Sequence, residues 1–540
     1  MKTISGNIVN VLSGKIFSGT LEINNGIISS IVENDNTYDT FIIPGFIDSH
    51  IHIESSMLPP SEFARIAVKH GTIGVVADAH EIANVLGVDG IKFMIENAQT
   101  SPLKYAFSAP SCVPATPFET SGAYITAEDI ETLFKDFPDV RFLGEMMNFP
   151  GVLHDDPEIL RKLELAKEHN KPVDGHAPGL SGEELEKYVS AGISTDHECF
   201  TKEEALEKLS LGMKILIREG SAAKNFDALI SIADEHFKNC MFCSDDKHPD
   251  DLLEGHINIL VKRAIETGLD IMKALRMASV NPIKHYGLDV GLLQENDPAD
   301  FLVVDSLEEL NIHQTVINGE IVCKKGKARF PRKKILPENN FHIDPKLVRD
   351  FYIDNNYKKM PVIEVIDGQL ITKRIDRNIK IENHNLISDT ENDILKIAVI
   401  NRYENKTLIL GFVKNFGLKK GAIASSVAHD SHNIIVVGVS EKDMCEAVNM
   451  IILEKGGICV VCEEDGISEI LPLPIAGLMS DQHFYKVADQ YSKLDTLAKK
   501  LGSELSAPFM TLSFMALLVI PEIKLSDKGL FDSDLFEFIK

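Results

Sequence analysis

Apolar and polar positions alternate in blocks from about residue 41 to residue 290. Short apolar runs of strand length are separated by segments whose apolar residues recur at helical spacing, several of them with helix-capping residues. Such helical segments include SEFARIAVKHG, AEDIETLFKDF, DPEILRKLELAKEHN, SGEELEKYVSAG and TKEEALEKLSLG. The strand-like runs are FIIPGFIDSHIH, GTIGVVADAHE, LKYAFSAPSCVP, VRFLGEMMNFPG, PVDGHAPG, ISTDHECF, MKILIREGS and NCMFCSDDKHP. Eight β/α units in about 240 residues predict an α/β fold, a (β/α)8 TIM barrel over residues 44–289, with its chemistry at the C-terminal ends of the strands.

The segments on either side of this region are rich in strand patterns. Residues 1–43 contain short strand-like runs with an Asn25-Gly26 hairpin turn, and residues 299–328 repeat the pattern with Asn318-Gly319. We therefore expect residues 1–43 and 290–335 to pair with each other into one small β-domain.

A third region follows a basic, proline-containing linker, KARFPRKKILPENN. Strand-like and helical runs alternate again, which predicts a C-terminal α/β domain over residues 336–540. Its segment GLKKGA lacks the spaced glycines and the Ser or Thr after Lys that a phosphate-binding loop needs.

Composition and charge narrow the possible functions. The 540 residues are 44% hydrophobic and 25% charged, as in ordinary globular proteins with a large core, and the formal net charge is −26. That charge disfavours binding to nucleic acid or to an anionic membrane surface. The start of the chain does not resemble a signal peptide, and PFMTLSFMALLVIP is shorter than the roughly 20 residues of a membrane span. We expect a soluble, cytoplasmic protein.

Two of the cysteine pairs have C-x-x-C spacing, Cys240/Cys243 and Cys459/Cys462. A zinc ribbon would place its second pair within a few tens of residues, whereas about two hundred residues separate these pairs. Both pairs also lie in apolar strand-like runs. We therefore predict buried free thiols.

The first barrel run ends in His50 and His52, which face the same side of a strand. Alone, such a pair could arise by chance, and His176, His197 and Glu145 could each have a structural role. Together with Asp245 they give four imidazoles and two carboxylates at strand ends, enough for two metal ions with one carboxylate bridging. Two adjacent metal ions would acidify a shared water to hydroxide near neutral pH, and a carboxylate beside it could take the proton.

Further polar residues lie at the same end of the predicted barrel. Asp78, His80 and Glu81 end the second run. Glu81 or His80 could transfer protons and Asp78 could contact the substrate, or the cluster could instead hold an extra metal ion or cap a helix. Weaker candidates for substrate contacts are Ser111 and the neighbours Arg218 and Glu219, which could instead form an ion pair. In the C-terminal region, VAHDSHN carries His429 and Asp430 as further candidates for substrate contacts. This loop either lines or covers the pocket at the barrel mouth of its own or a neighbouring subunit, or is a local turn without contact to the barrel.

Several of these motifs resemble a known family. PGFIDSHIHIE, the single histidines on runs five and six, the Asp after run eight and ALRMASVNPIKHYGL resemble the amidohydrolase superfamily of metal-dependent hydrolases. More narrowly, VVADAHEIANVLG, SCVPATPFETSGA, LGEMMNFPGV, REGSAAKN, SDDKHPDDLLEGHI and PFMTLSFMALLVIPEIKLSDKGL resemble the bacterial adenine deaminase family across nearly the whole chain. Glu145 stands where dihydroorotases and ureases carry a carboxylated lysine, and the H-x-E…P-C-x-x-C motif of the other deaminase fold is absent.

The resemblance implies hydrolysis of adenine to hypoxanthine and ammonia for purine salvage. It implies two manganese or iron(II) ions per chain, held by His50, His52, Glu145, His176, His197 and Asp245. Asp245 would take the hydroxide proton, and Glu81 or His80 would serve the ring nitrogen or leaving amine. We expect a homo-oligomer whose small-molecule partner is adenine. The alternatives are an amidohydrolase acting on another aminopurine or a cyclic amide, and an inactive barrel kept for assembly or metal storage.

Overall fold

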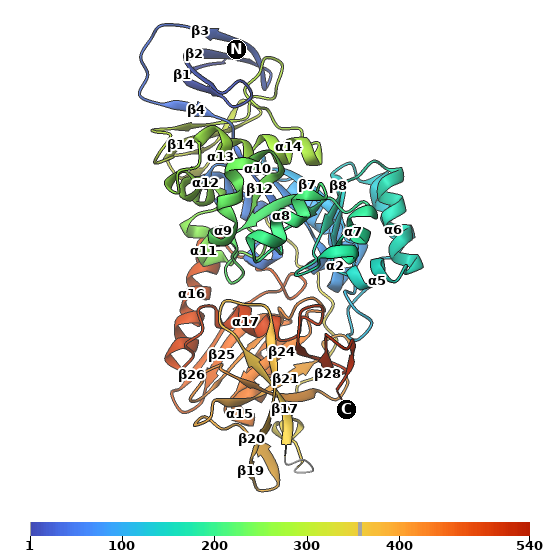
Figure 1. Ribbon diagram of the computed structural model, residues 1–540. Helices are drawn as coiled ribbons and strands as arrows, with labels where there is room; N and C mark the ends of the chain where they lie inside the picture. The colour runs from blue at the N-terminus through green and yellow to red at the C-terminus, as the bar shows by residue number, and fades with distance from the viewer. Residues whose placement is uncertain (1, 355–358, 540) are drawn as a thin grey trace.

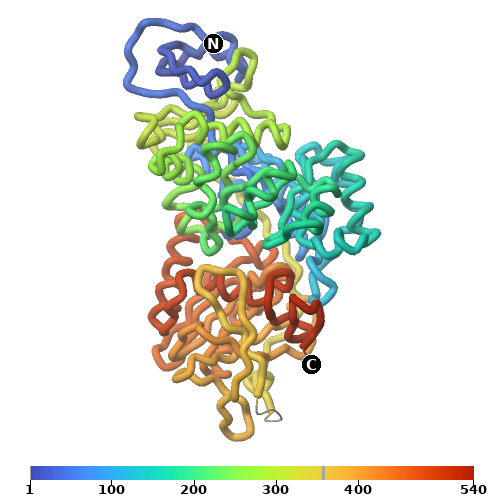
Figure 2. Tube along the Cα trace, in the orientation of Figure 1, coloured from blue at the N-terminus to red at the C-terminus, as the bar shows by residue number. Residues whose placement is uncertain are grey.

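The computed structural model describes residues 2–354 and 359–539. A sheet built around the N-terminus lies at one end, the barrel lies in the middle, and the C-terminal region forms the other end (Figures 1 and 2). The candidate residues lie between the barrel and the C-terminal region.

Eight parallel strands form the barrel, and each of the eight predicted runs contains one of them. They form a five-stranded and a three-stranded sheet. Parallel bridges at Val173–Ile193 and Ile51–Asp245 join the two sheets and close the barrel. The strands are β5 (Phe46–Ile51), β6 (Thr72–Ala77), β7 (Lys104–Ala109), β8 (Val140–Met146), β9 (Val173–Gly175), β10 (Thr195–Asp196), β11 (Lys214–Arg218) and β12 (Cys240–Cys243). The predicted (β/α)8 barrel is confirmed.

Helices surround the barrel, and the five segments with predicted helical spacing form α1, α4, α6, α7 and α8. Their starts follow from capping: Thr126 and Asp129 form a capping box at α4, and the Asp156 side chain accepts from the first-turn amides of α6. The barrel-region helices are α1 (Pro60–Ala67), α2 (His80–Leu86), α3 (Val88–Ala98), α4 (Ala127–Asp136), α5 (Phe149–Leu153), α6 (Pro157–Glu168), α7 (Gly182–Ser190), α8 (Lys202–Ser210), α9 (Phe226–Leu229), α10 (Ala233–His236), α11 (Pro249–Glu254), α12 (Ile257–Glu266), α13 (Ile271–Met277) and α14 (Val280–Tyr286).

Strands from both flanks of the barrel region form one sheet, in the order β16-β15-β14-β13-β4-β1-β2-β3. The pairing of β4 with β13 joins the N-terminal flank to the later one. Asn25 (φ 50°) and Gly26 (φ 81°) adopt the left-handed conformation that a two-residue hairpin requires. The strands are β1 (Lys2–Asn10), β2 (Lys15–Asn24), β3 (Ile27–Glu33), β4 (Phe41–Ile43), β13 (Phe301–Val304), β14 (Ile312–Ile317), β15 (Glu320–Lys324) and β16 (Lys327–Ala328).

The C-terminal region is built on a second eight-stranded sheet, ordered β18-β17-β22-β21-β24-β23-β25-β26. Its strands alternate with helices less regularly than the sequence pattern suggests. All the pairings except β17–β22 are antiparallel, and antiparallel neighbours can be joined by a short turn without a crossover helix. The strands are β17 (Lys359–Val365), β18 (Thr372–Asn378), β21 (Ile394–Ile400), β22 (Ile409–Lys414), β23 (Ala422–Ser425), β24 (Ile434–Gly438), β25 (Gly457–Cys462) and β26 (Ile467–Pro472).

Both faces of the central strands β21, β24, β23 and β25 are buried, which explains their long apolar runs. On β21, Leu395 and Ile397 belong to the same core as the barrel, whereas Ala398 and Ile400 pack with residues of helix α15 (Glu441–Glu454). The C-terminal sheet is therefore joined to the barrel by continuous apolar packing. The region also contains α16 (Phe484–Lys500), α17 (Pro508–Phe514), the hairpin β19 (Lys380–Glu382) and β20 (Asn385–Ile387), and the three strands β27 (Ile523–Ser526), β28 (Gly529–Asp532) and β29 (Glu537–Phe538).

Two sequence predictions concern the cysteines and the apolar segment near the C-terminus. All eight cysteines are free and buried, as predicted, with Cys240 and Cys243 in β12 and Cys459 and Cys462 in β25. Within residues 2–354 and 359–539, no helix is long and apolar enough to cross a membrane. The apolar segment near the C-terminus instead forms α17, whose residues are buried.

Candidate active site

The six predicted metal ligands lie together at the C-terminal ends of the barrel strands. His50 and Glu145 are the second-last residues of β5 and β8, respectively. The other four follow their strands directly or within two residues. Exposed fractions run from 0% for His50 to 7% for His176. The closure of the barrel positions part of the set, because the Asp245 amide donates to the His50 carbonyl at 2.9 Å.

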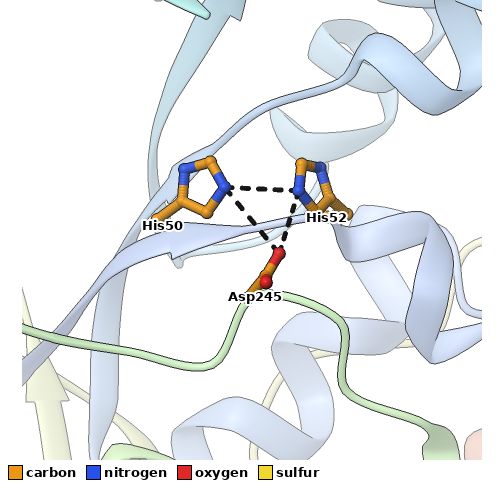
Figure 3. A group of neighbouring side chains, drawn as sticks. All are labelled: His50, His52 and Asp245. Atoms are coloured by element: carbon orange, nitrogen blue, oxygen red, sulfur yellow. Dashed lines mark hydrogen bonds and ion pairs between the residues drawn. The ribbon is translucent and has the colours of Figure 1, made fainter. Parts of the chain in front are cut away.

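His50, His52 and Asp245 converge on one point (Figure 3). The Nε2 atoms of the two imidazoles are 3.2 Å apart, and Asp245 Oδ1 lies 3.1 Å from His52 Nε2 and 3.8 Å from His50 Nε2. His52 Nδ1 lies 3.0 Å from the Asp78 carbonyl, to which it can donate. That hydrogen bond fixes the tautomer with the Nε2 lone pair directed into the site, which is the arrangement usual for metal-binding histidines.

Glu145 lies between this group and the histidines of strands β9 and β10. Its Oε1 is 3.3 Å from His52 Nε2, and its Oε2 is 3.3 Å from His197 Nε2 and 2.8 Å from His176 Nδ1. Burial alone would raise the pKa of Glu145, but the three surrounding histidines hold it well below its ordinary value. The residue is therefore a carboxylate with both oxygens directed at imidazoles.

Asp78 holds the strand that carries Glu145. One oxygen of its carboxylate accepts from Ser108 Oγ at 2.7 Å and the other from the Glu145 amide at 2.8 Å. A Cβ at Gly144 would lie 2.6 Å from the Asp78 carboxylate, so only glycine permits this approach. Asp78 thus acts on the backbone of β8 and does not line the cavity.

Arg218 orients Asp245. Its Nη1 donates to Asp245 Oδ2 at 2.6 Å, and the guanidinium also forms an ion pair with Glu198. Burial would raise the pKa of Asp245, but Arg218, His52 and His197 hold it well below its ordinary value. One oxygen of Asp245 is occupied by the guanidinium, and the other faces His50 and His52.

The C-terminal region covers this group of residues. A cavity of about 30 Å³ is lined on the barrel side by His80, Glu81 and all the ligand residues except His50, and on the other side by Leu370, His429, Asp430, Phe514 and Leu517. The VAHDSHN loop therefore lies over the barrel mouth of its own chain.

Glu81 is held by two histidines of that loop. His429 Nδ1 lies 2.6 Å from Glu81 Oε1, and His432 Nε2 contacts Glu81 Oε2. Burial would raise the pKa of Glu81, but the two histidines lower it well below its ordinary value. Burial alone would lower the pKa of His429, and Glu81 and Asp246 raise it to about 9.

His80 begins helix α2 and is surrounded by carboxylates. Its Nδ1 is 3.5 Å from Asp78 Oδ1, and its Nε2 is 3.4 Å from Glu81 Oε1 and 3.7 Å from Asp430 Oδ1. Burial lowers its pKa, but these three carboxylates together raise it well above the ordinary value of a histidine. The three carboxylates therefore favour the protonated form of His80 beside the ligand set.

Three of the weaker sequence candidates lie outside the cavity lining. Glu219 pairs with Arg263 at 2.8 Å, and Ser111 Oγ donates to the Glu145 carbonyl at 2.5 Å. Arg218 forms its ion pair with Glu198 and Asp245, and not with its neighbour Glu219. The sequence analysis did not identify Glu198, which lines the cavity. Its position directly after His197, at the end of a barrel strand, could have indicated that it lies in the site.

The chain that forms this closed barrel, with buried imidazoles and carboxylates at its strand ends, is similar in sequence to known proteins. The model of the amidohydrolase family matches residues 41–322, and the model of the adenine deaminase C-terminal domain matches residues 369–537. The adenine deaminase of Methanosarcina mazei is 52% identical, with 100% of this chain and 99% of the relative covered. That of Sulfurovum sp. is 53% identical, with 99% of each covered. A solved β-aspartyl dipeptidase from Fervidobacterium islandicum is 16% identical, covers 61% of this chain and 100% of its own, and has a TM-score of 0.46.

The barrel and its match define the class of the protein as an amidohydrolase, a hydrolase for which a divalent metal is expected. The similarity over the full length, including the C-terminal region, is more specific. The chain belongs to the adenine deaminase family.

Proposed function

We propose that this chain hydrolyses adenine to hypoxanthine and ammonia. The observation that carries the proposal is the group of six buried ligand-type residues with His80 beside it, in a chain that matches named adenine deaminases over its full length. A hydrolytic deamination needs an activated water and a proton donor for the leaving amine, and this group offers residues for both.

The donor set fits divalent metal ions. Imidazole nitrogens and carboxylate oxygens suit manganese, iron(II) and zinc, and candidate groups of three such residues overlap at His50, His197 and Glu145. We propose two manganese or iron(II) ions, one held by His50, His52 and Asp245 and one by His176 and His197, with Glu145 shared. Bound there, such ions would lower the pKa of a water molecule towards neutrality.

Asp245 is the proposed acceptor of the water proton. Arg218 holds its Oδ2, so its Oδ1 stays directed at the histidines that would surround that water. A fixed orientation matters because a general base must lie within hydrogen-bond reach of the proton that it takes.

We propose that His80 or Glu81 serves the purine ring nitrogen or the leaving amine, with His80 the better donor because His429 and His432 hold the pKa of Glu81 well below its ordinary value. Both line the cavity beside Glu145, with His80 Nδ1 3.6 Å from Glu145 Oε1. Asp430 and the two loop histidines fix this pair from the C-terminal side. We propose that the loop completes the donor arrangement and excludes water from it.

Other parts of the proposal concern the protein as a whole. We propose that it acts in purine salvage in the cytoplasm, as a homo-oligomer that binds adenine and neither nucleic acid nor membranes. We also propose three domains: residues 1–43 with 290–335, residues 44–289, and residues 336–540. Sedimentation would measure the oligomeric state, and limited proteolysis would locate the boundaries.

The test is ammonia release from adenine, guanine, cytosine and a dihydropyrimidine, measured together with metal content. We expect turnover of adenine, its loss on chelation, and recovery with manganese or ferrous iron. Undiminished turnover by metal-free protein would contradict the metal assignment. Turnover of the dihydropyrimidine in place of adenine would favour a cyclic-amide hydrolase.

A further inference from the structure

The cavity beside the ligand set is too small for a purine. Its volume of about 30 Å³ has room for only a few water molecules. The residues that enclose it come from both the barrel and the C-terminal region. Any base that reaches the ligand set must therefore displace part of this wall.

A larger cavity of about 410 Å³ lies on the other side of the wall. It is enclosed by the segments that follow β7, β8 and β9 and by the C-terminal residues around Val519 and Phe536. We call it the outer chamber. Its position at the boundary between barrel and C-terminal region places it beside the proposed catalytic residues.

The partition between the two cavities is thin. Met147 lines both of them, and the neighbours Leu517 and Leu518 line the inner cavity and the outer chamber, respectively. An unbranched methionine side chain has three rotatable bonds and adapts to different shapes at small cost. Because Met147 borders both spaces, rotation of its side chain is a small change that could connect them.

The lining of the outer chamber suits a flat aromatic molecule with a polar edge. Phe149, Phe536, Pro150 and Val519 supply apolar and aromatic surface, and Asn148 and Ser533 add hydrogen-bonding groups. A purine base has apolar ring faces for stacking and nitrogen atoms around its edge.

We propose that the outer chamber is a binding site for the purine base on its path to and from the ligand set, with Met147 as the gate. This inference rests on the proposed function, and it adds a site and a route. Bases would first associate with the aromatic wall and then pass Met147 to the metal ligands.

The chain contains no tryptophan, so a single introduced tryptophan reports on one location. Val519→Trp would place an indole in the outer chamber at a partly buried position, and a base entering the chamber would quench its fluorescence. Leu535→Trp is the matched control, because Leu535 lies in the same C-terminal segment, is 67% exposed and does not line the chamber. Both variants are titrated with adenine and hypoxanthine and assayed for ammonia release.

We expect quenching by both bases in Val519→Trp and not in Leu535→Trp. Filling the chamber should also lower kcat/KM for adenine by about tenfold or more, within the range by which association rates vary among interface mutants. kcat at saturating adenine and metal content should stay close to those of the unmodified protein, because the ligand set is untouched.

Equal kcat/KM in the two variants, with no quenching by either base, would overturn the proposal. If Val519→Trp does not fold, Asp534→Trp at the exposed rim of the chamber gives the same comparison. An unmodified protein that releases no ammonia from adenine would refute the proposed function instead. The fluorescence titration would then still test whether a base occupies the chamber.

Discussion

The contact between the C-terminal loop and Glu81 gives the sharpest quantitative prediction. Replacing His429 and Asp430 with Ala removes the 2.6 Å interaction of His429 Nδ1 with Glu81 Oε1 and the carboxylate that faces His80. A hydrogen bond to a charged group contributes about 1.5–3 kcal/mol. If that energy holds Glu81 and His80 in the reactive arrangement, its loss corresponds to a roughly 10- to 150-fold decrease in kcat.

The assay is steady-state ammonia release from adenine over a range of concentrations, with metal content and circular dichroism measured on the same samples. We expect lower kcat or higher KM with two metal ions per chain retained, because neither replaced residue is among the six proposed ligands. His384→Ala is the control, since His384 lies exposed in the β19–β20 hairpin of the same region. Kinetics of the double variant equal to those of His384→Ala would refute the reasoning and leave the loop with a role in assembly only.

Three further predictions concern single residues. Glu145→Gln should lose much of its activity and metal, because an amide cannot supply the shared negative charge; two ions per chain with full turnover would show that Glu145 is not the bridge. Asp245→Asn should lose several orders of magnitude in kcat with a smaller effect on adenine binding, and near-normal turnover would remove it from the mechanism. Lys524 is fully buried, and burial lowers its pKa from 10.5 in the unfolded chain to about 7 in the folded protein. Burying the charged lysine therefore lowers the free energy of unfolding by its full amount below the folded-state pKa. This destabilisation decreases as the pH rises and disappears above the unfolded-state pKa. Lys524→Met should therefore stabilise the protein by up to about 4 kcal/mol at pH 7 and about 2 kcal/mol at pH 9, seen as a melting-temperature gain that shrinks with pH. A gain that does not depend on pH would contradict a buried neutral lysine.

The barrel and most of its candidate site could be predicted from the sequence. Each strand is a short apolar run followed by a polar residue, and parallel strands in a barrel bring their C-terminal ends to one mouth. His50 and His52 share a face because side chains alternate along a strand, so convergence of the six ligands followed once eight units had been recognised. The two Asn-Gly hairpins were equally local, because their left-handed conformations are set by the two turn residues themselves.

Other features depended on contacts between segments far apart in the chain. Glu219 follows Arg218 directly, but consecutive residues of a strand point to opposite sides, and Arg218 instead pairs with Glu198 and Asp245. In the C-terminal sheet, apolar runs buried on both faces read alike whether their neighbours are parallel or antiparallel, so the pairing was not visible in the pattern.

The cover of the barrel mouth is the clearest case. The sequence identified the VAHDSHN loop as polar and left open whether it was a local turn or a lid. His429 and Glu81 are 348 residues apart, and they meet because the C-terminal sheet shares an apolar core with the barrel. Local periodicity determines which side chains an element presents and where it ends. Which elements then face each other depends on how whole apolar surfaces pack together, and only the tertiary structure decides that.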